Sequence, residues 1–246
     1  ASQRWSDPSY TRKAQALGDL ILNQESLWVQ GLGRSLLPGR HGFVSSQGTV
    51  KLNPSYAPGF ILARLAQAWP EEGRWAELYL GNQQLLLSAH IQGQYPDWLN
   101  LQNGAVLDDD NLHEGDFDAI RVYLWLGLNP NSDPIQNRLK SISKPFTDQI
   151  VRRQNTPLGW NPKSSALADK AGPAGFEWAM RPLLQSLYKA KLPPLPELPA
   201  QRDTDAWRSY GYYSAALSLF AQGHLDGHFV IEHNGQLSIR TKGLKR

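Results

Sequence analysis

Residues 115–125 read Gly-Asp-Phe-Asp-Ala-Ile-Arg-Val-Tyr-Leu-Trp, a polar start followed by an apolar run. This pattern predicts a helix over 117–128 that carries Asp118 at its N-terminal end and Arg121 one turn later. A carboxylate in that position is stabilised by unpaired backbone N–H groups and by the positive end of the helix dipole. Asp118 is therefore either a helix cap or a fixed carboxylate that accepts a proton from water.

The rest of the chain shows similar helical spacing, which predicts a mainly α-helical fold. A first helix is expected around 14–21, and extended structure is expected around 27–54. Near the C-terminus, Asn234-Gly235 separates two short apolar runs and predicts a hairpin with a two-residue turn. Further helices are expected over 55–69, 71–89, 133–152, 173–189 and 204–222.

The composition allows a sizeable core and excludes several functions. The 246 residues are 41% hydrophobic and include 9 Trp. No cysteine is present, so neither a disulfide nor a thiolate zinc site can form. The histidines are scattered along the sequence, and we expect no metal and no cofactor. The net charge of +3 comes from interspersed residues of both signs, which argues against nucleic acid as a partner. No run approaches the ~18 apolar residues of a membrane span, so no membrane insertion is expected.

The segment 193–199, Pro-Pro-Leu-Pro-Glu-Leu-Pro, is a stiff spacer. At this chain length it could separate two small domains. The helix predicted after it is strongly apolar, however, and needs the rest of the chain to cover it. A connection inside a single domain over 1–246 is therefore the favoured interpretation.

Aromatic residues outside the predicted helical faces favour a carbohydrate groove. Trp98 lies in the long loop 91–116, and Tyr212 and Tyr213 lie at a predicted helix start. Sugar rings present apolar faces that stack on flat aromatic side chains, while their hydroxyls bond to Asp, Asn and Arg. Aromatic residues also fill protein cores, and for these three residues that alternative stays open.

Glycoside hydrolysis needs two carboxyl groups. One protonates the leaving oxygen, and the other activates water or attacks the sugar. Asp118 suits the second role, because a helix N-terminus and Arg121 both favour a charged carboxylate. It suits the first role poorly, because a general acid must keep its proton until the bond breaks.

Several stretches together resemble glycoside hydrolase family 8. The segment from Asp118 to Trp125 resembles the part of that family that carries the catalytic base. The other matching blocks, in chain order, are 36–39, 52–56, 96–98, 131–134, 172–176, 212–213 and 219–223. The resemblance covers about 10–230. Within the family it is to the periplasmic endoglucanases encoded beside bacterial cellulose synthase, which implies a periplasmic or secreted protein.

The resemblance implies an (α/α)6 barrel, in which six helical hairpins surround the substrate cleft. It also implies hydrolysis of a β-1,4-glucan with inversion at the anomeric carbon, by a Glu acid and an Asp base. Asp118 is then the base, and Arg121 orients it or pairs with it. Asn53 and Tyr56 are expected to line the cleft close to the cleavage point. The other residues expected to contact the sugar are Asp97, Trp98, Phe117, Tyr212 and Tyr213.

Two departures from the family pattern bear on this interpretation. Phe117 stands where many members carry Tyr, so a hydroxyl next to the base is lost. The family's general-acid Glu lies in a motif near the N-terminus of its domain, and no such motif is found in these residues. About seven or eight helices are expected here, whereas six hairpins need twelve. We therefore expect the C-terminal two-thirds of a barrel, with a minor β-hairpin.

An open barrel exposes inward-facing apolar surface, which is unfavourable by roughly 25 cal/mol per Å². The missing helices and the acid are therefore expected from an N-terminal segment of the same protein, present as a companion chain. The alternative is that the sequence is a fragment of a longer product, and in either case the isolated chain is predicted to be inactive. Two other functions remain open: a non-catalytic glucan-binding fragment, or a family 8 hydrolase acting on xylan, mixed-linkage glucan or chitosan.

Overall fold

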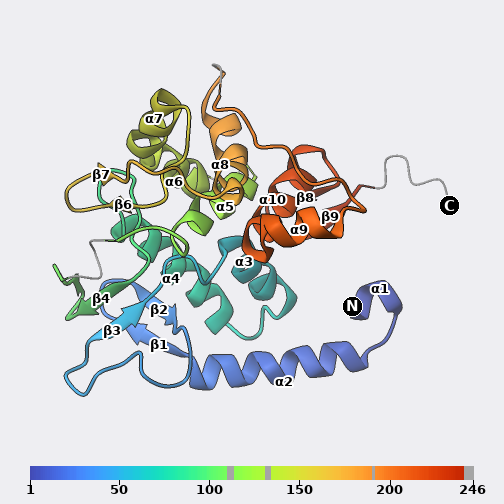
Figure 1. Ribbon diagram of the computed structural model, residues 1–246. Coiled ribbons are helices and arrows are strands. Elements are labelled where there is room, and N and C mark those ends of the chain that lie inside the picture. Colours follow the sequence, from blue (N-terminus) through green and yellow to red (C-terminus); the bar gives the residue numbers. More distant parts are fainter. Residues whose placement is uncertain (110–113, 131–133, 190–191, 241–246) are drawn as a thin grey trace.

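The computed structural model describes residues 1–109, 114–130, 134–189 and 192–240, apart from the side chains of residues 3 and 4, and it is mainly helical with small antiparallel sheets (Figure 1). The helices are α1 (Ser2–Trp5), α2 (Ser9–Gln24), α3 (Gly59–Ala68), α4 (Arg74–Ser88), α5 (Ile120–Leu128), α6 (Pro134–Ile142), α7 (Lys144–Arg153), α8 (Ala174–Leu187), α9 (Thr204–Tyr210) and α10 (Tyr212–Leu225). The strands are β1 (Ser26–Val29), β2 (Gly33–Leu36), β3 (Val50–Leu52), β4 (Leu99–Gln102), β5 (Ala105–Val106), β6 (Trp160–Asn161), β7 (Ala166–Leu167), β8 (Phe229–Ile231) and β9 (Leu237–Ile239). They pair in the orders β1-β2, β3-β4-β5, β6-β7 and β8-β9.

The predicted mainly helical fold is confirmed, but two predicted helices are each divided in two. The range 133–152 holds α6 and α7, separated at Ser143. Pro145 lies in the first turn of α7, where its missing N–H costs no helical hydrogen bond. The range 204–222 holds α9 and α10, separated by Gly211 at φ 84°, a conformation that Gly adopts without strain.

Two helices begin later than predicted. Helix α3 starts at Gly59 rather than at 55, because Asn53 to Ser55 form a turn in which the Asn53 side chain accepts the Ser55 N–H at 2.9 Å. Helix α5 starts at Ile120 rather than at 117. Of the block at 131–134, only Pro134 lies within the described residues.

The C-terminal hairpin β8–β9 is present, but the predicted two-residue turn is wrong. The N–H of Gly235 donates to the carbonyl of Glu232 at 2.9 Å, and the N–H of Glu232 donates to the carbonyl of Gln236 at 2.9 Å. The loop therefore has three residues and ends with Gly235 at φ 76°, as in a type I turn followed by a left-handed residue. A Cβ at Gly235 would stand 1.9 Å from the carbonyl oxygen of Phe60, so this longer loop lets the hairpin pack closely on α3.

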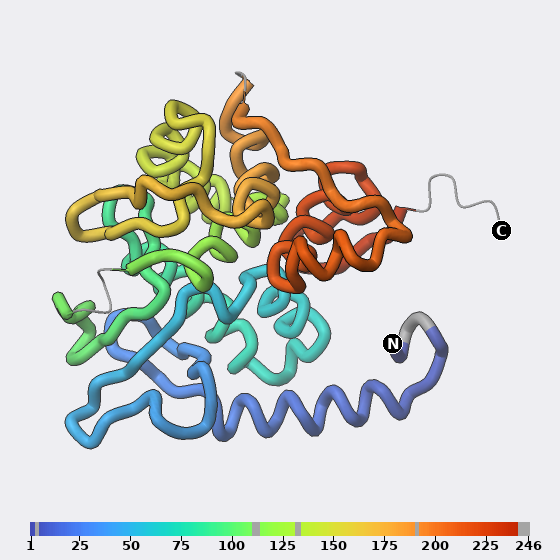
Figure 2. Tube along the Cα trace, in the orientation of Figure 1, coloured from blue at the N-terminus to red at the C-terminus, as the bar shows by residue number. Residues whose placement is uncertain are grey.

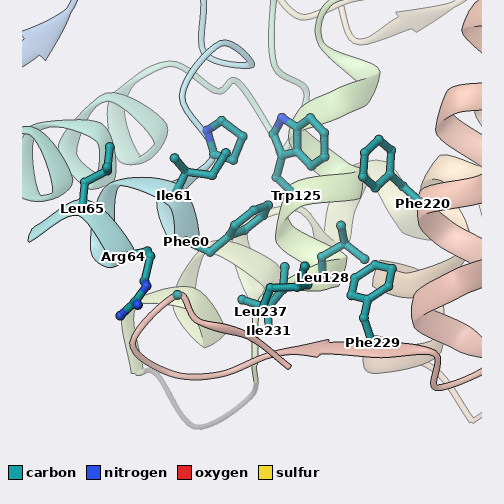
Figure 3. A pocket seen from close by; sticks show the side chains of 12 residues that line it. Phe60, Ile61, Arg64, Leu65, Trp125, Leu128, Phe220, Phe229, Ile231 and Leu237 are labelled. Carbon is teal, nitrogen blue, oxygen red and sulfur yellow. The ribbon is translucent and has the colours of Figure 1, made fainter. Parts of the chain in front are cut away.

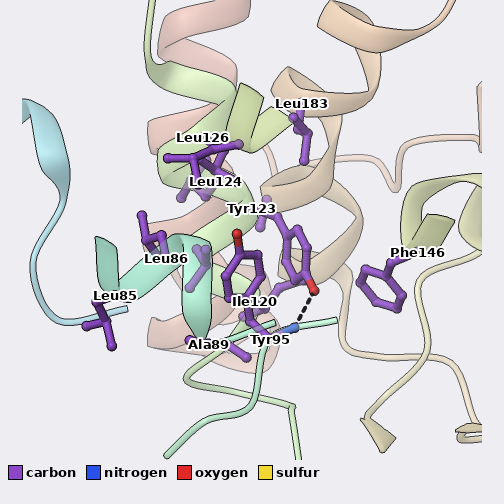
Figure 4. Packing of buried hydrophobic residues seen from close by; sticks show 14 of the residues in the cluster. Leu85, Leu86, Ala89, Tyr95, Ile120, Tyr123, Leu124, Leu126, Phe146 and Leu183 are labelled. Atoms are coloured by element: carbon purple, nitrogen blue, oxygen red, sulfur yellow. Dashed lines mark hydrogen bonds between the residues drawn. The ribbon is translucent and has the colours of Figure 1, made fainter. Parts of the chain in front are cut away.

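Helix α5 lies in the core and is buried on almost every side (Figure 4). Helix α8 crosses it so closely that a Cβ at Gly127 would stand 2.4 Å from the backbone nitrogen of Leu183. The hydroxyl of Tyr123 accepts the N–H of Tyr95 at 3.0 Å and donates to the carbonyl of Gly93 at 2.9 Å. These two bonds fix the segment that leads to Asp97 beside α5.

Helix α2 runs along one edge of the molecule, as the tube in Figure 2 shows. Its buried residues are Gly18 and Leu22, whereas Leu17 is 59% exposed and Leu20 is 52% exposed. Neither α2 nor any other helix in the described part of the chain has the length and apolarity needed to cross a membrane.

Candidate active site

The carboxylate of Asp118 lies in the turn before α5 and is held from two directions. Its Oδ2 accepts a hydrogen bond from Nδ2 of Asn53 at 2.8 Å, and its Oδ1 accepts one from Nη2 of Arg121. The side chain of Asp118 remains 23% exposed and that of Arg121 24% exposed. The structure therefore gives Asp118 a fixed orientation without closing it off from solvent.

Ser55 connects the two groups that hold Asp118. Its hydroxyl accepts hydrogen bonds from Nη2 and Nε of Arg121, at 2.7 and 3.1 Å. The same hydroxyl donates to Oδ1 of Asn53 at 2.7 Å. Asn53, Ser55, Asp118 and Arg121 thus form a closed ring of hydrogen bonds.

Sequence reasoning missed Ser55, although it lies in the same block as Asn53 and Tyr56. A hydroxyl two residues after an Asn suits a local turn, and that spacing was the available signal. Ser55 is 3% exposed and Asn53 5% exposed, so both are positioned by burial as well as by hydrogen bonds. The carbonyl of Ser55 also accepts the indole N–H of Trp125 at 3.0 Å, which ties the loop to the last part of α5.

Of the two interpretations of Asp118, the helix cap is wrong. The N-cap position of α5 is Ala119, and the carboxylate that accepts backbone N–H groups there belongs to Asp97. Oδ1 of Asp97 accepts the N–H of Ala119 and that of Asp116, each at 2.8 Å. The side chain of Asp118 is consequently free to face Asn53 and Arg121 instead.

Asp97 is a half-buried carboxyl group beside another acid. Burial is the largest cause that raises the pKa of Asp97, and a hydrogen bond with the side chain of Asp116 is the next. The N–H groups of Asp116 and Ala119 act in the opposite direction, and the net pKa is about 7. The structure thus gives Asp97 a role at the start of α5. Its predicted contact with the sugar stays a prediction.

Tyr56 and Trp98 lie together next to this ring of hydrogen bonds. The guanidinium of Arg121 stands 5.4 Å from the centre of the Tyr56 ring, and Tyr56 meets Trp98 edge-on at 5.4 Å. Trp98 also stacks on Phe43 at 6.1 Å, and the ammonium of Lys51 lies 4.9 Å from its ring centre. Trp98 is therefore packed among protein groups, while Tyr56 is 43% exposed.

Phe117, Tyr212 and Tyr213 form a second aromatic group beside Asp118. Phe117 is 44% exposed and packs against Tyr213 at 5.6 Å and Phe176 at 5.2 Å. The hydroxyl of Tyr213 donates to the carbonyl of Phe117, and burial raises the pKa of Tyr213 to about 12. Tyr212 is 89% exposed, and all three residues line a hollow of about 580 Å³.

Most of the predicted site residues therefore come together. Asn53, Tyr56, Asp118 and Arg121 contact one another directly, and the two aromatic groups adjoin them. Within the residues that the structure describes, no three His, Asp or Glu side chains are grouped as metal ligands would be.

A partly exposed aspartate is fixed by an arginine and an amide, and aromatic side chains lie on its flanks. This arrangement matches one half of the carboxyl pair that carbohydrate hydrolases use. Comparison with known proteins identifies the class further. The chain belongs to family 8 of the glycosyl hydrolases, whose model matches residues 1–227.

Curated relatives of this chain are called endoglucanases. One from Xanthomonas axonopodis pv. citri (strain 306) is 34% identical over 244 residues, which cover 96% of this chain and 62% of that protein. One from Escherichia coli (strain K12) is 33% identical over 241 residues, with the same coverage of 96% and 62%. The chain thus spans 62% of the length of these relatives.

Solved structures agree with the fold. The endo-1,4-D-glucanase from Vibrio fischeri ES114 matches with a TM-score of 0.85 at 29% identity, over 98% of this chain and 69% of that one. An endo-β-1,4-glucanase from Acetobacter xylinum matches with a TM-score of 0.67 at 24% identity, over 90% of this chain and 65% of that one. At that lower identity the likeness concerns the fold alone.

Proposed function

We propose that the protein is an endo-acting β-1,4-glucan hydrolase, a cellulase, in which Asp118 is the general base. The observation that carries this proposal is the Asp118 carboxylate held between Asn53 and Arg121 while still open to solvent. The names of the endoglucanase relatives support the substrate class. The chain spans only part of the length of those relatives. The activity is therefore proposed for this chain together with the segment that corresponds to the rest of them.

In this mechanism a water molecule attacks the anomeric carbon from the face opposite to the leaving sugar. Asp118 accepts a proton from that water, and a second carboxyl group gives a proton to the leaving oxygen. Arg121 orients the carboxylate, and Asn53 fixes its second oxygen. Tyr56, Phe117, Tyr212 and the groups packed against them offer apolar faces to the sugar rings.

The acid and the rest of an (α/α)6 barrel are proposed to come from an N-terminal segment of the same protein, which completes the catalytic domain of 1–246. An apolar pocket of about 400 Å³ between α3, α5, α10 and the hairpin β8–β9 supports this (Figure 3). Phe220 is 53% exposed and Ile61 48% exposed in its wall, although such side chains are usually buried in a helical core. Inner helices of a complete barrel would cover this surface.

The intact mass of folded material tests the companion segment. Purification of the protein from its native source should yield the 27.6 kDa chain together with a further peptide, or one longer polypeptide that contains it. A single species of 27.6 kDa that cleaves glucan unaided would refute both the companion segment and the missing acid.

A periplasmic or secreted location, in association with bacterial cellulose biosynthesis, is part of the proposal. Its support is the resemblance of the sequence blocks to the endoglucanases encoded beside cellulose synthase. Fractionation of the source cells should find the protein outside the inner membrane, and a purely cytoplasmic signal would contradict this.

The activity itself is tested on carboxymethyl cellulose. The protein with its N-terminal part should lower the viscosity of the polymer faster than it releases reducing ends, and proton NMR should detect the α-anomer first, as inversion requires. If xylan, mixed-linkage glucan or chitosan is cut faster, the family assignment holds but the substrate is different. If soluble glucan binds and is never cut, the protein is a non-catalytic glucan-binding fragment.

A further inference from the structure

The turn that carries Asp118 has no regular structure of its own, since it lies between an isolated bridge at Gly115 and the first residue of α5. On one side it is bound to Trp160, whose N–H donates to the carbonyl of Gly115 at 2.8 Å and whose carbonyl accepts the Gly115 N–H at 2.9 Å. Gly115 allows this contact, because a Cβ there would stand 2.1 Å from the indole nitrogen of Trp160.

The side chain of Asp97 is the group that meets both ends of that turn. Its Oδ1 accepts the N–H of Asp116, two residues before Asp118, and the N–H of Ala119, one residue after it. Both distances are 2.8 Å. A single carboxylate oxygen therefore ties together the two backbone positions that flank Phe117 and Asp118.

Asp97 is itself fixed by its surroundings. Its own N–H donates to the carbonyl of Glu114 at 2.8 Å, and the preceding carbonyl of Tyr95 accepts the indole N–H of Trp160 at 2.7 Å. Tyr95 and Pro96 are both buried, and Tyr95 is further held by Tyr123 of α5. The segment 95–97 is thus a rigid support placed beside the start of α5.

We propose that Asp97 is a positioning residue, which fixes the turn over 116–119 and thereby presents the carboxylate of Asp118 to the substrate. This inference rests on the proposed role of Asp118 as the base. Asp97 acts through the backbone and not by touching the reacting atoms. Misplacement of a catalytic group by about 1 Å can lower a rate by roughly 10²-fold, so such a support has consequences for catalysis.

The groups around Asp97 agree with a support rather than a sugar contact. The side chain of Asp116 hydrogen-bonds to it, and Tyr123 and Tyr213 lie close enough for its charge to influence their pKa values. The neighbours that face it are therefore an acid, two phenols and backbone N–H groups.

The test compares Asp97→Ala and Asp97→Asn in the protein that includes its N-terminal part. The matched control is Asp203→Ala, because Asp203 caps α9 by accepting the N–H of Ala206 at 2.9 Å, in an exposed position. Asp97→Ala is expected to lower kcat by roughly 10-fold to 10²-fold and to change KM less than about 3-fold. Asp97→Asn keeps an amide oxygen for the two N–H groups and is expected to retain kcat within about 5-fold. Asp203→Ala is expected to leave kcat unchanged.

Backbone amide hydrogen exchange gives a second readout that needs no activity. The amides of Asp116 and Ala119 should exchange at least about 10-fold faster in Asp97→Ala than in the wild type, and not faster in Asp203→Ala. Unchanged exchange, or an unchanged kcat in Asp97→Ala, overturns the inference. A rise in KM alone, equal in Asp97→Ala and Asp97→Asn, also overturns it, because that result indicates direct contact with the sugar.

The test of Asp97 and the test of the proposed function can fail independently of each other. If the wild type cleaves glucan and Asp118→Asn does not, the function stands whatever the Asp97 variants show. If the wild type cleaves no glucan, the function fails, and the exchange rates at Asp116 and Ala119 still decide whether Asp97 holds the turn.

Discussion

The two ends of helix α5 differ in what surrounds them. At its first turn, Arg121 belongs to a ring of hydrogen bonds with Asp118 and Ser55, in which each polar group finds its partner within the chain. At its last turn, Trp125 and Leu128 face an apolar pocket whose wall contains the exposed ring of Phe220 (Figure 3). One short helix therefore connects a ring of paired polar groups to an exposed apolar surface.

This difference indicates which groups the chain can order by itself and which it leaves exposed. Polar groups that must be oriented are expensive to leave unpaired, so a site whose hydrogen bonds all close within the chain can form without help. Apolar side chains need only to be shielded from water, and another segment can shield them. The polar groups around Asp118 can therefore take their places without a further segment, whereas the apolar surface beside Trp125 and Phe220 stays uncovered without one.

The largest effect is expected from Asp118→Asn, which breaks the polar end. An amide cannot accept a proton from the attacking water, so hydrolysis of carboxymethyl cellulose should fall by roughly 10³-fold, within the range for loss of a general base. The assay compares initial rates for the protein with its N-terminal part. Asp205→Asn is the control, because Asp205 is exposed and pairs with Arg208 on the surface. A variant at position 118 with normal activity would show that the base lies elsewhere.

A smaller effect at the same end is expected from Arg121→Met. The substitution keeps a long apolar stem but removes the guanidinium that contacts both Asp118 and Ser55. Turnover should fall by about 10²-fold, because the carboxylate loses the group that orients it. Steady-state kinetics on a soluble cello-oligosaccharide would measure it. Retention of full activity would mean that Asn53 alone is sufficient to hold the base.

The apolar end is tested by Phe220→Asp. A charge in the pocket should prevent the N-terminal segment from covering it, so activity of the assembled protein should fall by about 10-fold or more, while the isolated chain keeps its circular dichroism spectrum. Leu219→Asp is the matched control, because Leu219 is equally exposed at 53% but is not among the residues that line the pocket. Equal losses in the two variants would contradict a specific role for this surface.

The same contrast explains what the sequence could predict. One shared site was predicted for Asn53, Tyr56, Asp118 and Arg121, because these residues belong to short blocks whose order resembles that of a known family. The structure brings the four side chains into contact. The function of these residues was inferred from that resemblance, since the spacing of Asp118 alone fits a helix cap equally well.

What the sequence could not predict depends on contacts between distant backbone positions. The cap of α5 comes from Asp97, which lies 19 and 22 residues before the two N–H groups that it accepts. No local pattern records such a partner. The breaks at Ser143 and Gly211 were missed for a related reason, because helical spacing of apolar residues continues across both of them.

Asp97 also makes the free energy of unfolding depend on pH. Its pKa is raised from 3.8 to about 7, so between these values the folded protein binds more protons than the unfolded chain. The contribution of this carboxyl to the free energy of unfolding therefore falls as pH rises from about 4 to about 7, and is constant above that. Urea denaturation from pH 4 to 8 should show this fall in the wild type but not in Asp97→Asn. A difference between the two proteins that stays constant over this range would contradict it.

The smallest effect is expected at Trp125, which contacts both the loop that holds Asp118 and the wall of the apolar pocket. Its indole N–H donates to the carbonyl of Ser55 at 3.0 Å, while its ring packs edge-on against Phe60 at 6.0 Å in the pocket wall. Trp125→Phe removes the donor and keeps an aromatic ring, so the free energy of unfolding should fall by about 1 kcal/mol, the net value of one hydrogen bond, and turnover by less than about 3-fold. Trp28→Phe is the control, because Trp28 is 67% exposed. If turnover fell as far as in Arg121→Met, the apolar end would control the geometry of the base, and the two ends of α5 could not be treated as independent.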